Sequence, residues 1–219
     1  VVYDCDTGRP EGLAESTDGP MCLWVRPDMG GKLQPGKYAG AADISTGAGA
    51  TNSVLSVYNA RLGEKVAEFA TCTMSPERFA VYCNAAMWLF KDQDGLPGLF
   101  GWESVGPGVY FGRVVQELDY PNMYYQSHLI NVPRGKRNRE PGWNPAGKNK
   151  RQMLDCYRAA IYDWKCTNFS DIALSECAAW HYTGVGDQVS HPGESTAYDP
   201  TGARYNHGDR VIADALAWK

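Results

Sequence analysis

Short runs of apolar and β-branched residues alternate with turn residues along most of the chain. Turn pairs such as Gly30-Gly31, Pro35-Gly36 and Pro97-Gly98 lie between many of these runs, and such pairs favour tight reversals of the backbone. The runs that predict strands span residues 21–26, 54–58, 66–74, 109–117, 123–132 and 211–218. We therefore expect a mainly β fold, a single compact β-barrel-like or sandwich domain with long loops.

Two segments instead show helical spacing. In residues 75–90, Ser75 is suited to cap a helix, Pro76 fits its first turn, and apolar residues recur every three or four positions. Residues 150–164 also place their apolar side chains on one face. The sequence thus predicts one or two short helices on the β core. Residues 133–149, which are polar and rich in Pro, Gly and Asn, are expected to form an exposed loop.

Length and composition fit one domain. The chain has 219 residues, with 24 Gly and 13 Pro, and contains no run of 18 apolar residues. We expect residues 1–219 to form a single domain without a membrane span. The absence of an initiator Met and the abrupt end suggest a processed product or a fragment of a longer chain.

One basic segment stands out against a net charge of −4. Residues 134–151 hold seven cations and one acid, whereas the rest of the chain is acidic, which argues against a nucleic-acid-coating protein. We predict that this segment attracts an anionic partner such as a sulfated or sialylated glycan, the alternative being a solvated loop that keeps the domain soluble. The candidate binding residues are Arg134, Lys136, Arg137, Arg139 and Trp143.

The sequence shows no clear catalytic motif. Cys83, Asn84 and the distant His128 are a minimal set for a Cys/His nucleophile, but the apolar run around Cys83 predicts a buried, unreactive thiol. Histidines and aspartates crowd the last forty residues without the spacing of a metal site, and we interpret them as loop residues. They are His181, Asp187, His191, Asp199, His207 and Asp209. We expect no catalytic residue, no metal and no cofactor.

Seven cysteines at irregular spacings leave at least one unpaired within the chain. We interpret several of them as buried thiols that act as small apolar residues. A local bridge among Cys156, Cys166 and Cys177 is the alternative if the chain lies in an oxidising compartment.

The opening segment, residues 3–10, is similar to the first strand of enterotoxin-like ADP-ribosyltransferases, in which an Arg after the Tyr helps to hold NAD. Here Asp4 follows Tyr3, and residues 44–47 and the pair Gln116-Glu117 match the family's Ser-Thr-Ser strand and glutamate pair only in part. A secreted enzyme or toxin of this type, or of a Cys/His hydrolase type, is therefore the alternative function.

The chain as a whole resembles the capsid spike domains of astroviruses, especially the avian forms. Residues 2–12 and 22–27 are the segments most similar to that family. Tyr and Trp supply 20 of the 26 aromatic residues, a composition favoured at recognition surfaces. The resemblance implies a non-enzymatic, homodimeric viral capsid spike domain on the virion surface. It would attach to a host receptor, protein or glycan, and carry epitopes for neutralising antibodies, without binding nucleic acid or inserting into a membrane.

Overall fold

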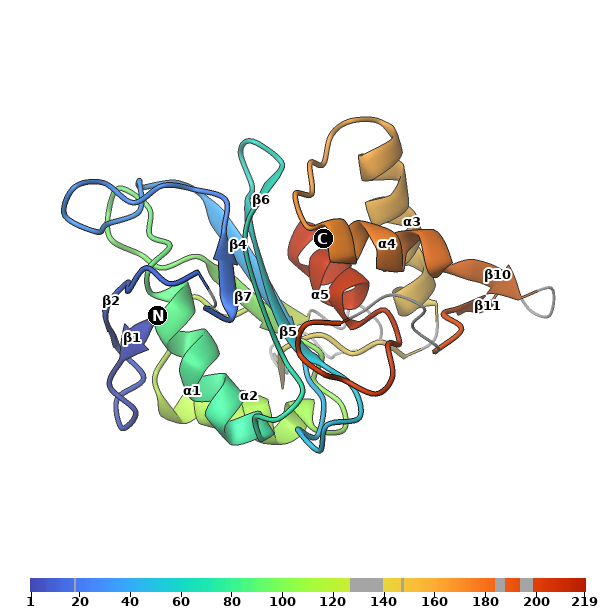
Figure 1. Cartoon of the computed structure of the whole chain (residues 1–219), viewed down its shortest axis with the longest axis horizontal. Coiled ribbons are helices and arrows are strands. Elements are labelled where there is room, and N and C mark those ends of the chain that lie inside the picture. The colour runs from blue at the N-terminus through green and yellow to red at the C-terminus, as the bar shows by residue number, and fades with distance from the viewer. Residues whose placement is uncertain (18, 127–139, 147, 184–187, 194–198) are drawn as a thin grey trace, which may run out of the picture.

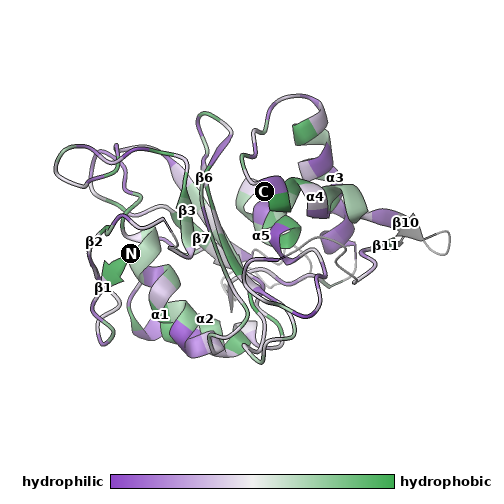
Figure 2. Cartoon of the chain, viewed as in Figure 1, coloured by the Kyte–Doolittle hydropathy of each residue, from purple (hydrophilic) through white to green (hydrophobic). Residues whose placement is uncertain are grey.

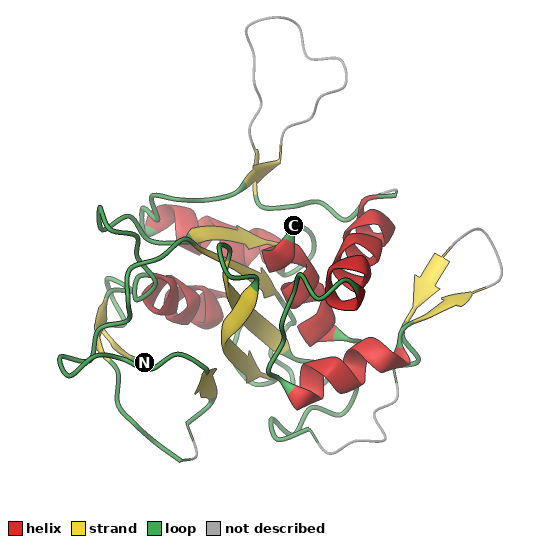
Figure 3. Ribbon diagram, turned by 90° about the horizontal axis from the view of Figure 1, so that it is seen from above, coloured by secondary structure: helices red, strands yellow, loops and turns green. Residues whose placement is uncertain are grey.

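A five-stranded mixed sheet lies at the centre of the computed structural model, which describes residues 1–17, 19–126, 140–146, 148–183, 188–193 and 199–219. The strand order is β3 (Met21–Leu23), β6 (Glu64–Thr71), β5 (Ser53–Asn59), β4 (Tyr38–Asp43) and β7 (Leu99–Trp102). Neighbouring strands are antiparallel except β4 and β7, which are parallel. Helices lie on both faces of this sheet, so the chain forms three layers (Figures 1 and 3).

Three small hairpin-like pairs lie outside the central sheet. In each pair the two strands are antiparallel. They are β1 (Val2–Tyr3) with β2 (Pro10–Gly12), β8 (Tyr125–Gln126) with β9 (Glu140–Pro141), and β10 (His181–Thr183) with β11 (Gln188–Ser190).

Helices α1 (Pro76–Met87) and α2 (Gly108–Glu117) cover one face of the sheet. The Ser75 side chain accepts a hydrogen bond from the backbone N–H of Arg78, as expected for a helix cap. Aromatic side chains from the sheet and both helices, including Phe69, Phe79, Phe100 and Phe111, form the core of this layer. Figure 2 shows hydrophilic residues on the outer sides of these two helices.

Helices α3 (Asn149–Tyr162), α4 (Asp171–Ala179) and α5 (Asp209–Trp218) cover the opposite face. Helix α5 packs directly on β4 and β5, and all of its residues from Asp209 to Ala217 are buried. A second core cluster joins this helix to α3 and to side chains of the sheet such as Tyr58. The central helix of this layer therefore has no face left for solvent.

The prediction of a mainly β fold is wrong, because the structure is mixed α/β with a helical layer on each side of the sheet. Segments 109–117 and 211–218, predicted as strands, are helices α2 and α5. Their β-branched residues favour strands locally, but tertiary packing overrides that weak preference. In α5 the polar residues Asp209, Arg210 and Asp214 are buried together with the apolar ones, so the helix has no solvent-exposed polar face.

Other local predictions agree better with the structure. The predicted helices at 75–90 and 150–164 are confirmed as α1 and α3, and the predicted strands at 54–58 and 66–74 overlap β5 and β6. Helix α4 was not predicted. Of the predicted loop 133–149, Glu140–Pro141 forms β9, and residues 133–139 and 147 lie outside the described residues.

All seven cysteines are free thiols in the structure, and Cys72, Cys83 and Cys166 are buried, in agreement with their interpretation as small apolar residues. Burial raises the pKa of the Cys83 thiol well above its ordinary value, so this thiol remains protonated. Within the described ranges, none of the helices has the length and apolar character needed to cross a bilayer.

Candidate active site

Two carboxylates follow the ends of the parallel pair of strands. Asp43 is the last residue of β4, and Glu103 comes directly after β7. The strands are aligned so that Ala42 faces Trp102, and the Glu103 N–H donates to the carbonyl oxygen of Ala42 at 3.2 Å. Because parallel strands end at the same edge of a sheet, these two acids, sixty residues apart in sequence, become neighbours.

A third carboxylate reaches this edge from the opposite end of the chain. Asp209 is the first residue of α5, and its Oδ2 accepts a hydrogen bond of 3.0 Å from the backbone N–H of Asn52. Asn52 directly precedes β5, in which Val54 is the register partner of Asp43. The sheet and α5 therefore bring Asp43, Glu103 and Asp209 to one site.

The pKa values of all three acids are raised, and Asp43 is influenced by the other two. Burial raises the pKa of Asp43 well above its ordinary value, and the nearby charges of Asp209 and Glu103 raise it further. Burial also raises the pKa of Glu103, and raises that of Asp209 to about 7 even though the Asn52 N–H favours its ionised form. Lys150, near the start of α3, lowers the pKa of both Asp43 and Glu103. The site thus gathers more negative charge than its surroundings neutralise.

The residues of this site suit a divalent metal ion by type and placement. Carboxylate oxygens are the preferred ligands of hard cations such as Mg²⁺ and Mn²⁺, and a cation would relieve the repulsion that raises these pKa values. In the described part of the chain, no three or more His, Cys, Asp or Glu side chains already stand in a preformed metal-holding arrangement. Holding a cation between Asp43, Glu103 and Asp209 would therefore require their side chains to turn toward one another.

Comparison of the whole structure with solved structures shows which fold it shares. The nuclease domain of the large terminase from the thermophilic phage G20c superposes with a TM-score of 0.61 at 14% sequence identity, covering 98% of this chain and 94% of that one. The same domain with bound magnesium gives a TM-score of 0.63, and the corresponding domain of Thermus phage P74-26 gives 0.56 at 15% identity, covering 98% of this chain and 93% and 91% of those chains, respectively. The chain has the fold of a large terminase nuclease domain.

No protein-family model and no curated protein sequence matches the chain. The relationship to the terminase nuclease fold is therefore visible in three dimensions and not in the sequence. At 13–15% sequence identity, this chain and the terminase nuclease domains share an architecture, while few of their side chains are the same.

The terminase nuclease fold overturns the predicted resemblance to astrovirus spike domains. The predictions that depended on this resemblance are therefore wrong as well. They are the capsid attachment role, the virion-surface location, and the host-receptor and antibody partners. The expectations of no enzymatic activity and no nucleic-acid partner are also wrong on this comparison, because the similar structures are nuclease domains, some of them with bound metal. The alternative of an ADP-ribosyltransferase or Cys/His hydrolase is not supported either. The predicted homodimer stays a prediction.

Of the residues predicted to bind an anionic partner, Trp143 is among the described residues. Arg134, Lys136, Arg137 and Arg139 are outside the described residues, so their role stays a prediction. Trp143 is described, and its side chain is fully buried in the core cluster between α3 and α5. Its ring packs inside the protein and offers no contact area at the surface.

The site formed by the three acids was largely missed in the sequence. Asp209 was noted only as one of several acids in the last forty residues and was interpreted as a loop residue, whereas it begins a buried helix. Asp43 and Glu103 were not singled out. The available signal was an acid placed directly after a short apolar run, in Ala41-Ala42-Asp43 and Gly101-Trp102-Glu103.

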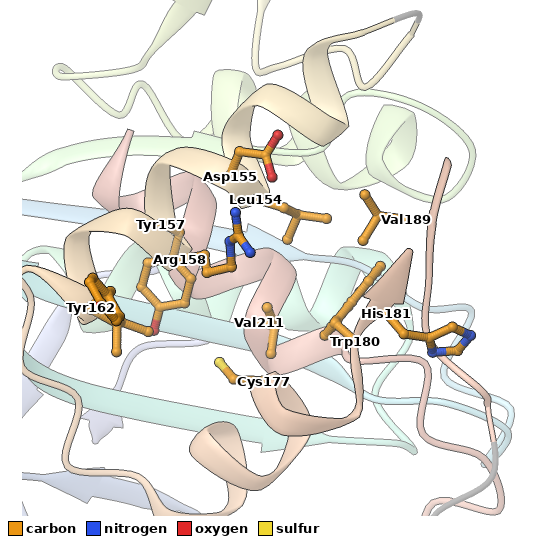
Figure 4. A pocket seen from close by; sticks show the side chains of 11 residues that line it. Leu154, Asp155, Tyr157, Arg158, Tyr162, Cys177, Trp180, His181, Val189 and Val211 are labelled. Carbon is orange, nitrogen blue, oxygen red and sulfur yellow. The ribbon is translucent and has the colours of Figure 1, made fainter. Parts of the chain in front are cut away.

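A pocket of about 460 Å³ lies next to this site, between α3, α4 and α5 (Figure 4). Its walls are mainly apolar and include Leu154, Tyr157, Trp180 and Val211. The Trp180 ring packs against Gly208, the residue before Asp209, and the ammonium of Lys150 lies 5.6 Å from the centre of the same ring. The pocket is thus adjacent to the acidic site, but the chemistry of the site resides in the three carboxylates.

Proposed function

We propose that the chain is a divalent-metal-dependent nuclease domain that hydrolyses phosphodiester bonds of DNA. The observation that carries this proposal is the meeting of Asp43, Glu103 and Asp209 at one edge of the sheet, in a fold shared with terminase nuclease domains. When three neighbouring carboxylates ionise, their mutual repulsion lowers the free energy of unfolding. A bound cation would offset this repulsion, which is why such a cluster suits a metal site.

Each residue has a role that follows from its position. Asp43, Glu103 and Asp209 would hold the metal, and their rigid attachment to β4, β7 and α5 fixes its place relative to the sheet. A bound divalent cation would polarise a phosphoryl oxygen and lower the pKa of a coordinated water. Lys150 faces the same acids from the first turn of α3, where its positive charge is suited to attract the phosphate backbone of the substrate.

Cleavage of supercoiled plasmid DNA tests this proposal. With Mg²⁺ present, we expect the wild-type protein to nick or linearise the plasmid, and we expect EDTA to stop the reaction. Asp43→Asn and Glu103→Gln keep the size of the side chain but remove a ligand charge, and each should lower the rate by about 100-fold or more.

Glu117→Gln is the matched control. Glu117 lies on the exposed side of α2, where it pairs with the exposed Arg113, so its loss should leave the cleavage rate unchanged. Cleavage that survives in both site variants, or that persists in EDTA, would refute the assignment of the three acids.

A further inference from the structure

A buried guanidinium stands directly beside the third acid of the site. Arg210 follows Asp209 on α5 and is only 1% exposed. Its side chain donates to Glu176 Oε1 at 2.8 Å, Asp199 Oδ2 at 2.9 Å and Glu68 Oε1 at 3.1 Å. Its backbone N–H also donates to Glu176 Oε2 at 2.9 Å. The first turn of α5 is therefore attached to α4, to β6 and to the segment around residue 199.

Asp199 and Thr201, in the segment around residue 199, also form hydrogen bonds with Asn52, the residue whose backbone N–H donates to the Asp209 carboxylate. The side-chain amide of Asn52 donates to Asp199 Oδ2 at 2.8 Å, and the hydroxyl of Thr201 lies 2.6 Å from Asn52 Oδ1 and 2.8 Å from Asp199 Oδ1. Asn52 is 2% exposed and Asp199 is 9% exposed. Asn52 is thus fixed by its side chain while its backbone N–H donates to Asp209.

We propose that Asn52, Asp199 and Thr201 are positioning residues for Asp209, acting through a buried polar network anchored by Arg210. The network sets where the Asn52 N–H points, and that N–H sets the orientation of the Asp209 carboxylate. This inference rests on the proposed nuclease function, because it assigns a purpose to the orientation of a metal-binding carboxylate.

The chain contacts on both sides of Asp209 support this role. On one side Arg210 is held as described above. On the other side the Gly208 N–H donates to Asn206 Oδ1 at 2.8 Å, while the Asn206 amide donates to Glu176 Oε1 at 2.9 Å. Asp209 therefore lies between two residues that share Glu176 as a partner. Residues that orient a metal ligand through hydrogen bonds affect metal affinity without touching the metal.

Two variants test the network without removing the buried Arg210 charge. Thr201→Val replaces the hydroxyl with a methyl group of similar size, and Asp199→Asn keeps the shape of the side chain but removes its charge. Asn84→Ala is the control, because Asn84 is a buried amide on α1, across the sheet, that donates to the carbonyl oxygen of Gly8 at 2.6 Å. Each variant would be compared with the wild-type protein in two measurements.

The first measurement is the affinity for Mn²⁺, followed by the loss of the free-ion EPR signal. We expect the dissociation constant to rise about tenfold in Thr201→Val and Asp199→Asn and to stay unchanged in Asn84→Ala. The second is amide hydrogen exchange at Asn52 in the metal-free protein. Here we expect exchange about tenfold faster in the first two variants only.

The two measurements separate this inference from the proposed function. If the wild-type protein binds no Mn²⁺, the metal site is wrong, while the exchange rate of the Asn52 amide still decides whether the network holds that group. Asn52 exchange at the wild-type rate in both Thr201→Val and Asp199→Asn would overturn the inference. Equal changes in Asn84→Ala would also overturn it, since they would reflect a general loss of stability.

Discussion

The ammonium of Lys65 lies 2.6 Å from Oδ1 of Asp214, and both side chains are fully buried between the sheet and α5. The same ammonium is 2.6 Å from Glu68 Oε2. Burial alone would lower the pKa of Lys65, but the charges of Asp214 and Glu68 outweigh this effect and raise it. Lys65 therefore stays charged inside the protein and links β6 to the helix that carries Asp209.

Replacement of Lys65 by Met should destabilise the protein by about 3–5 kcal/mol, because it leaves the buried Asp214 carboxylate without its cation and removes one of the two cations that contact Glu68. Lys165→Met is the matched control. Lys165 pairs with Asp163 at the surface, where both side chains are largely exposed, so its loss should change the free energy of unfolding by less than about 1 kcal/mol. Urea denaturation of both variants checks the difference, and equal effects would contradict the structural role of Lys65.

Gly208 occupies a position that only glycine fits. Its φ is +78°, and a Cβ there would collide with the Trp180 ring. Gly202 has a similar φ of +76° but open space around it. Gly202→Ala should therefore cost about 1 kcal/mol of backbone strain, whereas Gly208→Ala should cost more and should also shift the start of α5. Thermal unfolding and Mg²⁺-dependent cleavage would show both effects, and a Gly208→Ala variant as stable as Gly202→Ala would argue against the contact.

The metal-free protein should lose stability as the pH rises from about 4 to about 7. The pKa of Asp209 is about 7 in the folded protein against an ordinary value of 3.8, and those of Asp43 and Glu103 are also raised. In this range the folded state binds more protons than the unfolded state, so the free energy of unfolding falls with rising pH.

Urea denaturation across this pH range, with and without Mg²⁺, measures the effect. We expect a shallower slope when Mg²⁺ is present, because the cation stabilises the ionised acids of the folded state. The double variant Asp43→Asn/Asp209→Asn should also give a shallower slope in the metal-free protein. A slope that is the same in the wild type and the double variant would show that other groups determine the pH dependence.

Local signals in the sequence were sufficient for some elements. Ser75 and Pro76 mark the start of α1, and one-sided apolar spacing marks α1 and α3. Helix α5 was predicted as a strand from its β-branched and aromatic residues, and its burial on all sides depends on partners elsewhere in the chain, Lys65 for Asp214 and Glu176 for Arg210. Val109, Val114 and Val115 in α2 favoured a strand by residue type, so the helical layers were underestimated.

The candidate site depends on contacts that a sequence pattern does not contain. Asp43 and Glu103 become neighbours only because β4 and β7 pair in parallel after a long crossover through β5, β6 and α1. Asp209 joins them through a hydrogen bond to Asn52, which is 157 residues away. None of the three acids has a motif of its own, so sequence spacing could not separate them from ordinary surface acids.

Diffraction from crystals soaked in Mn²⁺ tests the central claim most directly. An anomalous difference map identifies the position of the metal without assuming any activity. We predict a peak at about 2.0–2.3 Å from carboxylate oxygens of Asp43 and Asp209, with Glu103 beside it, and no such peak in crystals of Asp209→Asn. A well-occupied peak elsewhere, or none at these acids at Mn²⁺ concentrations that support DNA cleavage, would contradict the proposed site.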